Sequence, residues 1–229
     1  MAVKPQKGVD MAEKRCVIVG TGQVMGTKIA RAFGRDGFEL ALVARDQSHL
    51  DEVARNVADT GASISTFTAD VTRDESVQEL ARQVEEAMGA PDVVIYNPAV
   101  LESVRPSEME PTQLLSSLEV NFFGAMRVTR AFLPGMRSRG SGTILFTGGG
   151  FGIDPSIEFA SHSIGKAALR NYAHSLFKEL GPEGIHAATV TITAPVREGT
   201  EFDGDLIAAH YLALHRQSPE SRQWEIVHR

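Results

Sequence analysis

The sequence predicts a doubly wound α/β domain, in which a parallel sheet of about seven strands lies between two layers of helices. Short apolar stretches alternate with amphipathic stretches along most of the chain. The apolar stretches, such as CVIV and LALV, are almost free of polar residues, which is typical of parallel strands buried on both faces. Strands that alternate with helices favour parallel pairing in a three-layer α/β/α arrangement.

The elements follow in regular order along the chain. Strands are predicted at 16–19, 39–43, 63–68, 93–96, 143–146, 187–192 and 224–227. Helices are predicted at 25–35, 47–59, 74–88, 111–137, 158–180 and 205–216. A glycine follows most of these helices, where a left-handed backbone favours that residue: Gly37, Gly61, Gly89, Gly140 and Gly181.

Length and composition indicate one domain. A chain of 229 residues can bury one sizeable core but is short for two. Residues 1–14, MAVKPQKGVDMAEK, have no apolar central segment and are expected to form a disordered tail, which leaves a single domain over 15–229. No apolar run reaches the roughly 20 residues that a membrane span needs, so no membrane partner is expected.

Charge and cysteine content narrow the possible partners further. The net charge of −6 leaves no basic stripe to neutralise phosphates, so nucleic acid is not expected as a partner. The only cysteine, Cys16, lies in an apolar strand and cannot form an internal disulfide, which favours a reducing cytoplasm. No metal site is expected.

A glycine-rich turn follows the first strand. Gly20, Gly22 and Gly26 form the pattern Gly-x-Gly-x-x-x-Gly between that strand and the first helix. Such a turn lets the backbone approach a pyrophosphate, and the helix N-terminus points free N–H groups at the anion. The pattern by itself also fits a tight turn without a ligand, but its place at the start of the domain favours a dinucleotide.

The end of the second strand bears on the choice between NAD and NADP. Sites specific for NAD place an acidic residue there to bind the ribose 2′-hydroxyl. Here the strand ends LALVARD, so Ala44 stands at the acidic position and Arg45 follows it. Because a guanidinium pairs well with a 2′-phosphate, we expect NADP rather than NAD. Two alternatives stay open: Arg45 as a surface charge, and Asp46 as the acidic residue.

The third strand ends in ADVT. Asp70 is therefore expected at the rim of the adenine pocket. A helix-capping role before Glu75 is an alternative for Asp70 or for Thr72.

Several motifs, taken in order, resemble the short-chain dehydrogenase/reductase family over about residues 15–229. They are the glycine turn at 20–26, ADVT at 69–72, YNPA at 96–99, VNFFG at 120–124, the Lys of HSIGK at 162–166 and KELGPEGIH at 178–186. The resemblance implies a Rossmann-type fold, a nicotinamide cofactor, and a carbonyl or alcohol substrate. It also implies a homodimer or homotetramer built on the helices at 111–137 and 158–180.

The family's active site consists of an Asn, a Ser, a Tyr and a Lys. Asn121 and Lys166 match the Asn and the Lys, and Asn97 matches the second Asn of the family's Asn-Asn-Ala-Gly. His162 stands at the Tyr position, and Gly149, thirteen residues earlier, stands at the Ser position. The resemblance thus implies a divergent member that keeps the groups serving the cofactor, Lys166 above all, and has replaced those serving the substrate.

The replacement at His162 leaves two interpretations open. His162 lies one helical turn from Lys166, and an imidazole is a common proton donor. His162, Lys166 and Asn121 are therefore the candidate catalytic residues. Alternatively, His162 only fills the space of the Tyr or caps the helix. The glycines at 148–150 and 152 are expected to open space, and Thr147 is a candidate substitute for the Ser.

The segment after the sixth strand is short. About ten residues separate Pro195 from the next predicted helix, so the lid that closes the substrate site in the family is expected to be missing or very small. Three functions agree with these features: an NADP-dependent oxidoreductase with a degenerate site, a non-catalytic cofactor-binding or scaffold protein, and a non-redox isomerase or cyclase. The sequence does not name a substrate.

Overall fold

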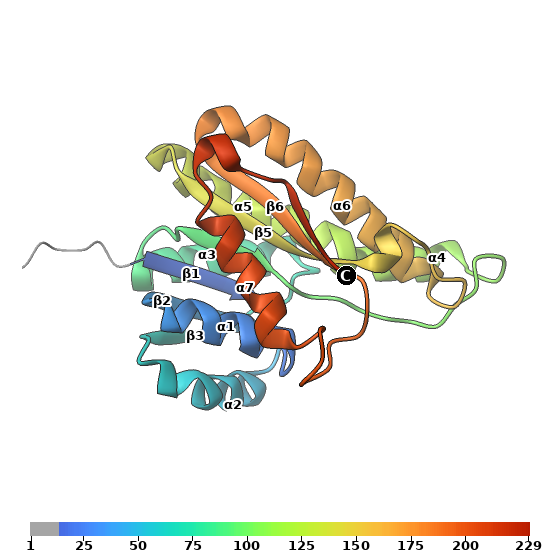
Figure 1. Ribbon diagram of the computed structural model, residues 1–229, viewed down its shortest axis with the longest axis horizontal. Helices are drawn as coiled ribbons and strands as arrows, with labels where there is room; N and C mark the ends of the chain where they lie inside the picture. The colour runs from blue at the N-terminus through green and yellow to red at the C-terminus, as the bar shows by residue number, and fades with distance from the viewer. Residues whose placement is uncertain (1–13) are drawn as a thin grey trace, which may run out of the picture.

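A seven-stranded parallel sheet forms the centre of the computed structural model, which describes residues 14–229. The strand order is β3-β2-β1-β4-β5-β6-β7, and every neighbouring pair is parallel. Helices cover both faces, as Figure 1 shows. The predicted doubly wound fold is confirmed.

Strands and helices alternate in the predicted order. The strands are β1 Lys14–Val19, β2 Phe38–Ala44, β3 Ile64–Thr68, β4 Val93–Tyr96, β5 Gly142–Gly149, β6 Ile185–Ile192 and β7 Glu225–His228. The helices are α1 Met25–Arg35, α2 Gln47–Val57, α3 Asp74–Met88, α4 Pro111–Leu118, α5 Gly124–Arg139, α6 Ala160–Leu180 and α7 Gly204–His215. Lys14 already belongs to β1, although it was expected in the tail; the rest of that expected tail lies outside the described residues.

Alternate residues of β1 face two separate hydrophobic cores. Val17 and Val19 face the core that contains α3, α5 and α6, whereas Cys16 and Ile18 face the core with α1, α2 and α7. All four side chains are buried. The apolar strands predicted from sequence are therefore covered on both faces, as a parallel sheet requires.

The order of the strands reverses between β1 and β4. From β1 the chain builds outward to β2 and β3, then returns to place β4 on the other side of β1. In sheets of this kind the crevice at the carboxyl ends of the strands, where the direction changes, is the usual ligand site. The glycine turn after β1 and the segment after β4 meet at this crevice.

The predicted helix at 111–137 is interrupted by a π-helical turn. Residues Glu119–Phe123 separate α4 from α5 and contain Asn121. The hydroxyl of Tyr96 donates a hydrogen bond to the carbonyl of Val120 within this turn. A side chain that bonds a helical carbonyl in this way is a recognised cause of a local distortion. The turn places Asn121 in the buried interior, beside the crevice.

One predicted helix end was wrong. Gly37, Gly61, Gly89 and Gly140 have a positive φ, but Gly181 has φ −53° and begins a short 3₁₀ turn that ends at Gly184, whose φ is +80°. The helical turns after α6 therefore continue past Gly181 and end at Gly184. Within residues 14–229, no helix is both long enough and apolar enough to cross a membrane.

Candidate functional site

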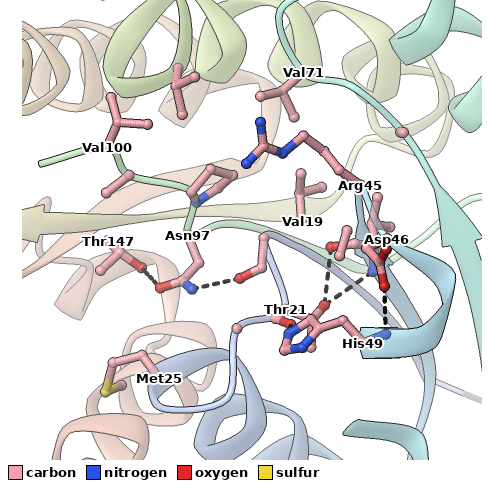
Figure 2. Close-up of a pocket in the computed structure, with 18 of the residues that line it drawn as sticks. Val19, Thr21, Met25, Arg45, Asp46, His49, Val71, Asn97, Val100 and Thr147 are labelled. Atoms are coloured by element: carbon pink, nitrogen blue, oxygen red, sulfur yellow. Dashed lines mark hydrogen bonds between the residues drawn. The ribbon is translucent and has the colours of Figure 1, made fainter. Parts of the chain in front are cut away.

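A cavity of about 880 Å³ lies at the carboxyl ends of β1, β2 and β4 (Figure 2). Most of the cofactor residues expected from sequence line it: Gly20, Gly22, Arg45, Asp70 and Asn97. Lys166 and Gly26 are not among the lining residues. The crevice thus brings together residues from four separate stretches of the chain.

The three glycines of the turn differ in what a side chain would meet at each position. Gly20 has φ +79°, and a Cβ there would lie 2.6 Å from atoms of Pro98. A Cβ on Gly26 would lie 2.6 Å from Cα of Thr21, so Gly26 lets helix α1 fold back onto the turn. Around Gly22 a Cβ would meet nothing within 4 Å. Gly22 therefore keeps open space in the cavity, whereas Gly20 and Gly26 are required by packing.

Asn97 joins the glycine turn to β5. Its Nδ2 donates to the carbonyl of Gly20 at 2.7 Å, and its Oδ1 accepts from Oγ1 of Thr147 at 2.8 Å. Oγ1 of Thr147 also lies 2.7 Å from the hydroxyl of Tyr211 on α7. The Thr147 hydroxyl therefore already has two protein partners, one on the segment that follows β4 and one on α7.

Arg45 and Asp46 have separate roles. Asp46 caps α2, since its carboxylate accepts hydrogen bonds from the backbone N–H of His49 and the hydroxyl of Ser48. These bonds lower the pKa of the Asp46 carboxyl. Arg45 is exposed and forms no salt bridge with any other residue of 14–229, and its guanidinium extends into the cavity toward Val71 (Figure 2). Asp46 is therefore engaged as a cap, and Arg45 is the group that faces the cavity.

Asp70 stabilises the turn after β3. Its Oδ1 accepts from the backbone N–H of Thr72 at 3.0 Å and from the Thr72 hydroxyl at 2.8 Å, and both bonds lower the pKa of the carboxyl. Arg73 occupies the N-cap position of α3. The helix-capping alternative for Asp70 and Thr72 was therefore wrong, and Asp70 lies at the cavity rim as expected.

Asn121 is fully buried and holds the backbone of Val100 on both sides. Its Oδ1 accepts from the N–H of Val100, and its Nδ2 donates to the carbonyl of Val100, both at 3.0 Å. A Cβ on Gly165 of α6 would lie 2.7 Å from Cβ of Asn121, so the glycine allows α6 to pack against it. Asn121 thus fixes the segment after β4 through both of its side-chain amide atoms.

His162 also contacts the backbone carbonyl of Val100. Its Nδ1 lies 2.8 Å from the carbonyl oxygen of Val100, and its ring packs edge-on against Phe151. Burial lowers the pKa of His162, the bond to Val100 opposes this shift, and the charge of Lys166 lowers the pKa further. The surroundings of His162 therefore favour the neutral imidazole.

Lys166 is buried directly behind the end of β5. Its Nζ donates to the carbonyl of Thr147 at 2.7 Å, and burial lowers its pKa to about 8. A Cβ on Gly149 would lie 3.4 Å from Cγ of Lys166, an ordinary contact. Gly149, where the family resemblance leads one to expect a Ser, therefore adjoins Lys166 and has room for a Cβ.

The other glycines of this stretch do not open space, contrary to expectation. A Cβ on Gly148, Gly150 or Gly152 would lie within 2.8 Å of Thr189, Thr193 or the backbone of Lys166, respectively. These glycines are required because neighbouring backbone and side chains approach closely. Gly148 and Gly149 belong to β5, so this part of the stretch is ordered sheet.

Three contributors to the site escaped the sequence analysis. Val100 contributes its backbone carbonyl, and every residue type has one, so the sequence gives no indication of this role. Tyr211 lies 64 residues from Thr147 and carries no motif. Nε2 of His49 lies 2.9 Å from the carbonyl of Thr21 on the cavity wall, and only the docking of α2 beside the glycine turn brings them together.

Comparison with known proteins decides the family. The family model described as short chain dehydrogenase matches residues 14–206, which is most of the chain. The chain belongs to this family. Among curated relatives, an uncharacterised oxidoreductase of Staphylococcus saprophyticus is 29% identical over 198 residues, covering 86% of this chain and 83% of the relative.

Solved structures of other short-chain dehydrogenases share the fold. An alcohol dehydrogenase of the archaeon Thermococcus sibiricus, complexed with 5-hydroxy-NADP, superposes with a TM-score of 0.83 at 26% identity, covering 94% of this chain and 95% of the other. A metagenomic short-chain oxidoreductase in complex with NADP gives a TM-score of 0.83 at 25% identity, with 93% and 95% covered.

Proposed function

We propose that this short-chain dehydrogenase binds NADP and transfers hydride between the nicotinamide and a carbonyl or alcohol substrate. The observation that carries the proposal is the cavity, whose walls combine the open space at Gly22 with the guanidinium of Arg45. Two relatives of known structure are described with NADP or a derivative of it, which supports the same cofactor here.

The preference for NADP over NAD rests on charge. Arg45 is the cationic side chain of the cavity wall, and Asp46, the nearest carboxylate in sequence, is held as the cap of α2. A ribose 2′-phosphate beside Arg45 would gain a charge-assisted hydrogen bond, which is about twice as strong as a neutral one. The ribose of NAD, with its 2′-hydroxyl, would gain no comparable contact.

Lys166 and Asn97 complete the proposed cofactor site. The ammonium of Lys166 lies beside the end of β5, where it donates to the carbonyl of Thr147, and its remaining N–H groups are the proposed donors to ribose hydroxyls. Asn97 keeps the end of β4 and the glycine turn in fixed relation. When bound, the cofactor supplies hydride chemistry, and these residues orient it at the carboxyl edge of the sheet.

The test is a titration of the protein with NADPH and with NADH, followed by cofactor fluorescence and calorimetry. We expect tighter binding of NADPH, and Arg45→Ala should weaken NADPH binding about 10- to 100-fold while leaving NADH binding unchanged. Arg55→Ala, on the exposed side of α2 and away from the cavity, is the matched control. Equal affinity of the unaltered protein for both cofactors would contradict the NADP assignment.

Hydride transfer is tested separately, by absorbance at the nicotinamide band with alcohols plus NADP⁺ and with ketones or aldehydes plus NADPH. Turnover in at least one direction supports the oxidoreductase. Tight NADPH binding without any turnover would instead support the non-catalytic cofactor-binding protein.

We also propose a cytoplasmic homo-oligomer. The buried free thiol of Cys16 agrees with a reducing compartment, and the family resemblance supports self-association. Light scattering coupled to size exclusion measures the oligomeric state, and a monomer at micromolar concentration would contradict this proposal.

A further inference from the structure

A chain of hydrogen bonds joins the C-terminal helix α7 to the glycine turn after β1. Nδ2 of Asn97 lies 2.7 Å from the carbonyl oxygen of Gly20, and Oδ1 of Asn97 lies 2.8 Å from Oγ1 of Thr147 (Figure 2). Oγ1 of Thr147 in turn lies 2.7 Å from the hydroxyl of Tyr211. The chain therefore crosses the carboxyl edge of the sheet, from α7 past β5 and β4 to the turn after β1.

The direction of every bond in this chain follows from the backbone carbonyl of Gly20. A carbonyl oxygen only accepts, so the amide nitrogen of Asn97 must face it and Oδ1 must face Thr147. An amide oxygen also only accepts, so the Thr147 hydroxyl donates its single hydrogen to Asn97. The Tyr211 hydroxyl is then the donor to Thr147. No member can reverse its role without the loss of a bond.

The position of Tyr211 is itself well fixed. Its side chain is fully buried in the core that contains α1, α2 and α7. Burial raises the pKa of the phenol above its ordinary range, and the bond to Thr147 opposes only part of this shift, so the phenol keeps its hydrogen at neutral pH. Nζ of Lys28 on α1 lies 2.7 Å from Oδ2 of Asp205, which fixes the first turn of α7 against α1.

Thr147 connects Tyr211 to two parts of the proposed cofactor site. The Thr147 hydroxyl acts through Asn97 on the glycine turn, where the diphosphate is expected. The backbone carbonyl of Thr147 accepts at 2.7 Å from Nζ of Lys166, the proposed donor to ribose hydroxyls. Asn97 and Thr147 line the cavity, whereas Tyr211 does not. Tyr211 can therefore influence a bound molecule only through Thr147.

From this geometry we propose that Tyr211 is a positioning residue of the cofactor site, through which α7 holds the glycine turn and the end of β5 in the arrangement that receives the dinucleotide. The inference rests on the proposed function and adds to it a residue that does not touch the cofactor. Groups that are already in place bind more tightly, because less conformational freedom is lost on binding. NADPH and NADH share the diphosphate and the nicotinamide ribose, so loss of the Tyr211 hydroxyl should weaken binding of both equally.

The same strand and helix offer a matched control at the opposite edge of the sheet. Oγ1 of Thr143, near the start of β5, lies 2.9 Å from Nδ1 of His215, the last residue of α7. Neither residue lines the cavity. Thr147→Val and Thr143→Val therefore each remove a hydroxyl bond between β5 and α7, and only the bond of Thr147 continues to the glycine turn.

The first measurement is a titration of each variant with NADPH and with NADH, followed by cofactor fluorescence and calorimetry. We expect Tyr211→Phe to weaken binding of both cofactors about three- to tenfold, and Thr147→Val to weaken it further. Thr143→Val should bind both like the unaltered protein. In an Asn97→Ala background, Tyr211→Phe should cost less affinity than it does alone, because the two residues act through one chain of bonds.

The turn can also be followed without any cofactor, by ¹H–¹⁵N hydrogen exchange. The N–H groups of Gly20 and Thr21 donate to the carbonyl of Val43, and the N–H of Gly22 donates to the carbonyl of Gly20. We expect these three amides to exchange about three- to tenfold faster in Tyr211→Phe than in Thr143→Val. Tyr211→Phe keeps the ring and its packing, so this variant tests the proposal even where Thr147→Val fails to fold.

Three results would overturn the role of Tyr211 and leave the proposed function intact. They are unchanged cofactor affinity in Tyr211→Phe, unchanged exchange of the turn amides in that variant, and a loss of affinity in Thr143→Val as large as that in Tyr211→Phe. An unaltered protein that binds neither cofactor would overturn the proposed function and, with it, the role of Tyr211 in cofactor binding.

Discussion

Nδ2 of Asn97 lies 2.7 Å from the carbonyl oxygen of Gly20 and donates a hydrogen bond to it. This bond ties the end of β4 to the first glycine of the turn after β1. The neighbouring Pro98 packs against Gly20 so closely that no side chain fits between them. The turn is therefore fixed by contacts with Asn97 and Pro98 as well as by its own glycines.

Gly20 and Gly22 should respond very differently to alanine. Gly20→Ala forces a Cβ into a left-handed backbone and to within 2.6 Å of Pro98, so we expect a loss of about 2 kcal/mol or more in the free energy of unfolding. Gly22→Ala meets no protein atom and should keep its stability, yet weaken NADPH binding by occupying the cavity. Urea unfolding and cofactor titration measure the two effects. Equal stability of both variants would show that the packing against Pro98 relaxes freely.

The hydroxyl of Thr147 stabilises the site by joining Asn97 to Tyr211. Thr147→Val would leave the buried hydroxyl of Tyr211 and the half-buried amide oxygen of Asn97 without their bond, at a cost of about 1–3 kcal/mol. Tyr211→Phe removes one partner and keeps the bond to Asn97, so its cost should be smaller, about 0.5–1.5 kcal/mol. Urea unfolding of both variants, at constant m-value, measures the order. A larger loss for Tyr211→Phe would contradict the arrangement.

Lys166 should destabilise the free protein. Burial lowers its pKa from 10.5 to about 8, so below pH 8 the folded state holds an ammonium that is more stable in the unfolded chain. Between pH 8 and 10.5 the unfolded state binds more protons, so the free energy of unfolding contributed by this group rises with pH. Lys166→Met should therefore be about 1–2 kcal/mol more stable at pH 7, after the lost bond to Thr147 is allowed for, and the gain should shrink toward pH 10.

Urea unfolding at pH 7, 8.5 and 10 checks this dependence, with the exposed Lys178→Met of the same helix as the control. The same Lys166 variant should bind NADPH more weakly, since it lacks the ammonium. A variant less stable than the unaltered protein at pH 7 would show that the hydrogen bond to Thr147 outweighs the cost of burial.

Gly149 should accept a serine and Gly148 should not. A Cβ at Gly149 makes an ordinary contact with Lys166, whereas one at Gly148 lies 2.7 Å from the hydroxyls of Thr189 and Thr191. We expect Gly149→Ser to stay within about 0.5 kcal/mol of the unaltered protein and Gly148→Ser to lose about 1–3 kcal/mol. Thermal and urea unfolding distinguish the two, and a reversed order would mean that β5 ends in a different position.

Placing a Ser and a Tyr at the two positions where the family resemblance implies them should change the chemistry. In the double variant Gly149→Ser with His162→Tyr, the buried ammonium of Lys166 would lower the pKa of the new phenol, which can donate a proton at neutral pH. We expect ketone reduction at pH 7.5 to exceed that of the unaltered protein, and oxidation to need a higher pH. His162→Tyr alone is the control for the contribution of the serine, and an unchanged pH dependence would exclude His162 from proton transfer.

The sequence by itself determined the fold, and it predicts where a cofactor would bind. The apolar strands, their alternation with helices and the glycines at 20, 22 and 26 are local patterns, and local patterns survive in a single sequence. The same holds for Arg45 at the end of β2 and for His162 at the position where the family resemblance implies a Tyr. Each of these features can be recognised from residues that lie only a few positions apart in the sequence.

The tertiary structure alone decided what the side chains do there. Asp46 caps α2, and the hydroxyl of Thr147 forms hydrogen bonds with both Asn97 and Tyr211. Most of the glycines after Thr147 lie where neighbouring atoms leave no room for a side chain. Nδ1 of His162 meets the carbonyl of Val100, 62 residues away, which Asn121 holds in place from a π-turn. Such roles arise from hydrogen bonds between distant segments, and neither periodicity nor spacing along the chain records which acceptor a side chain will meet.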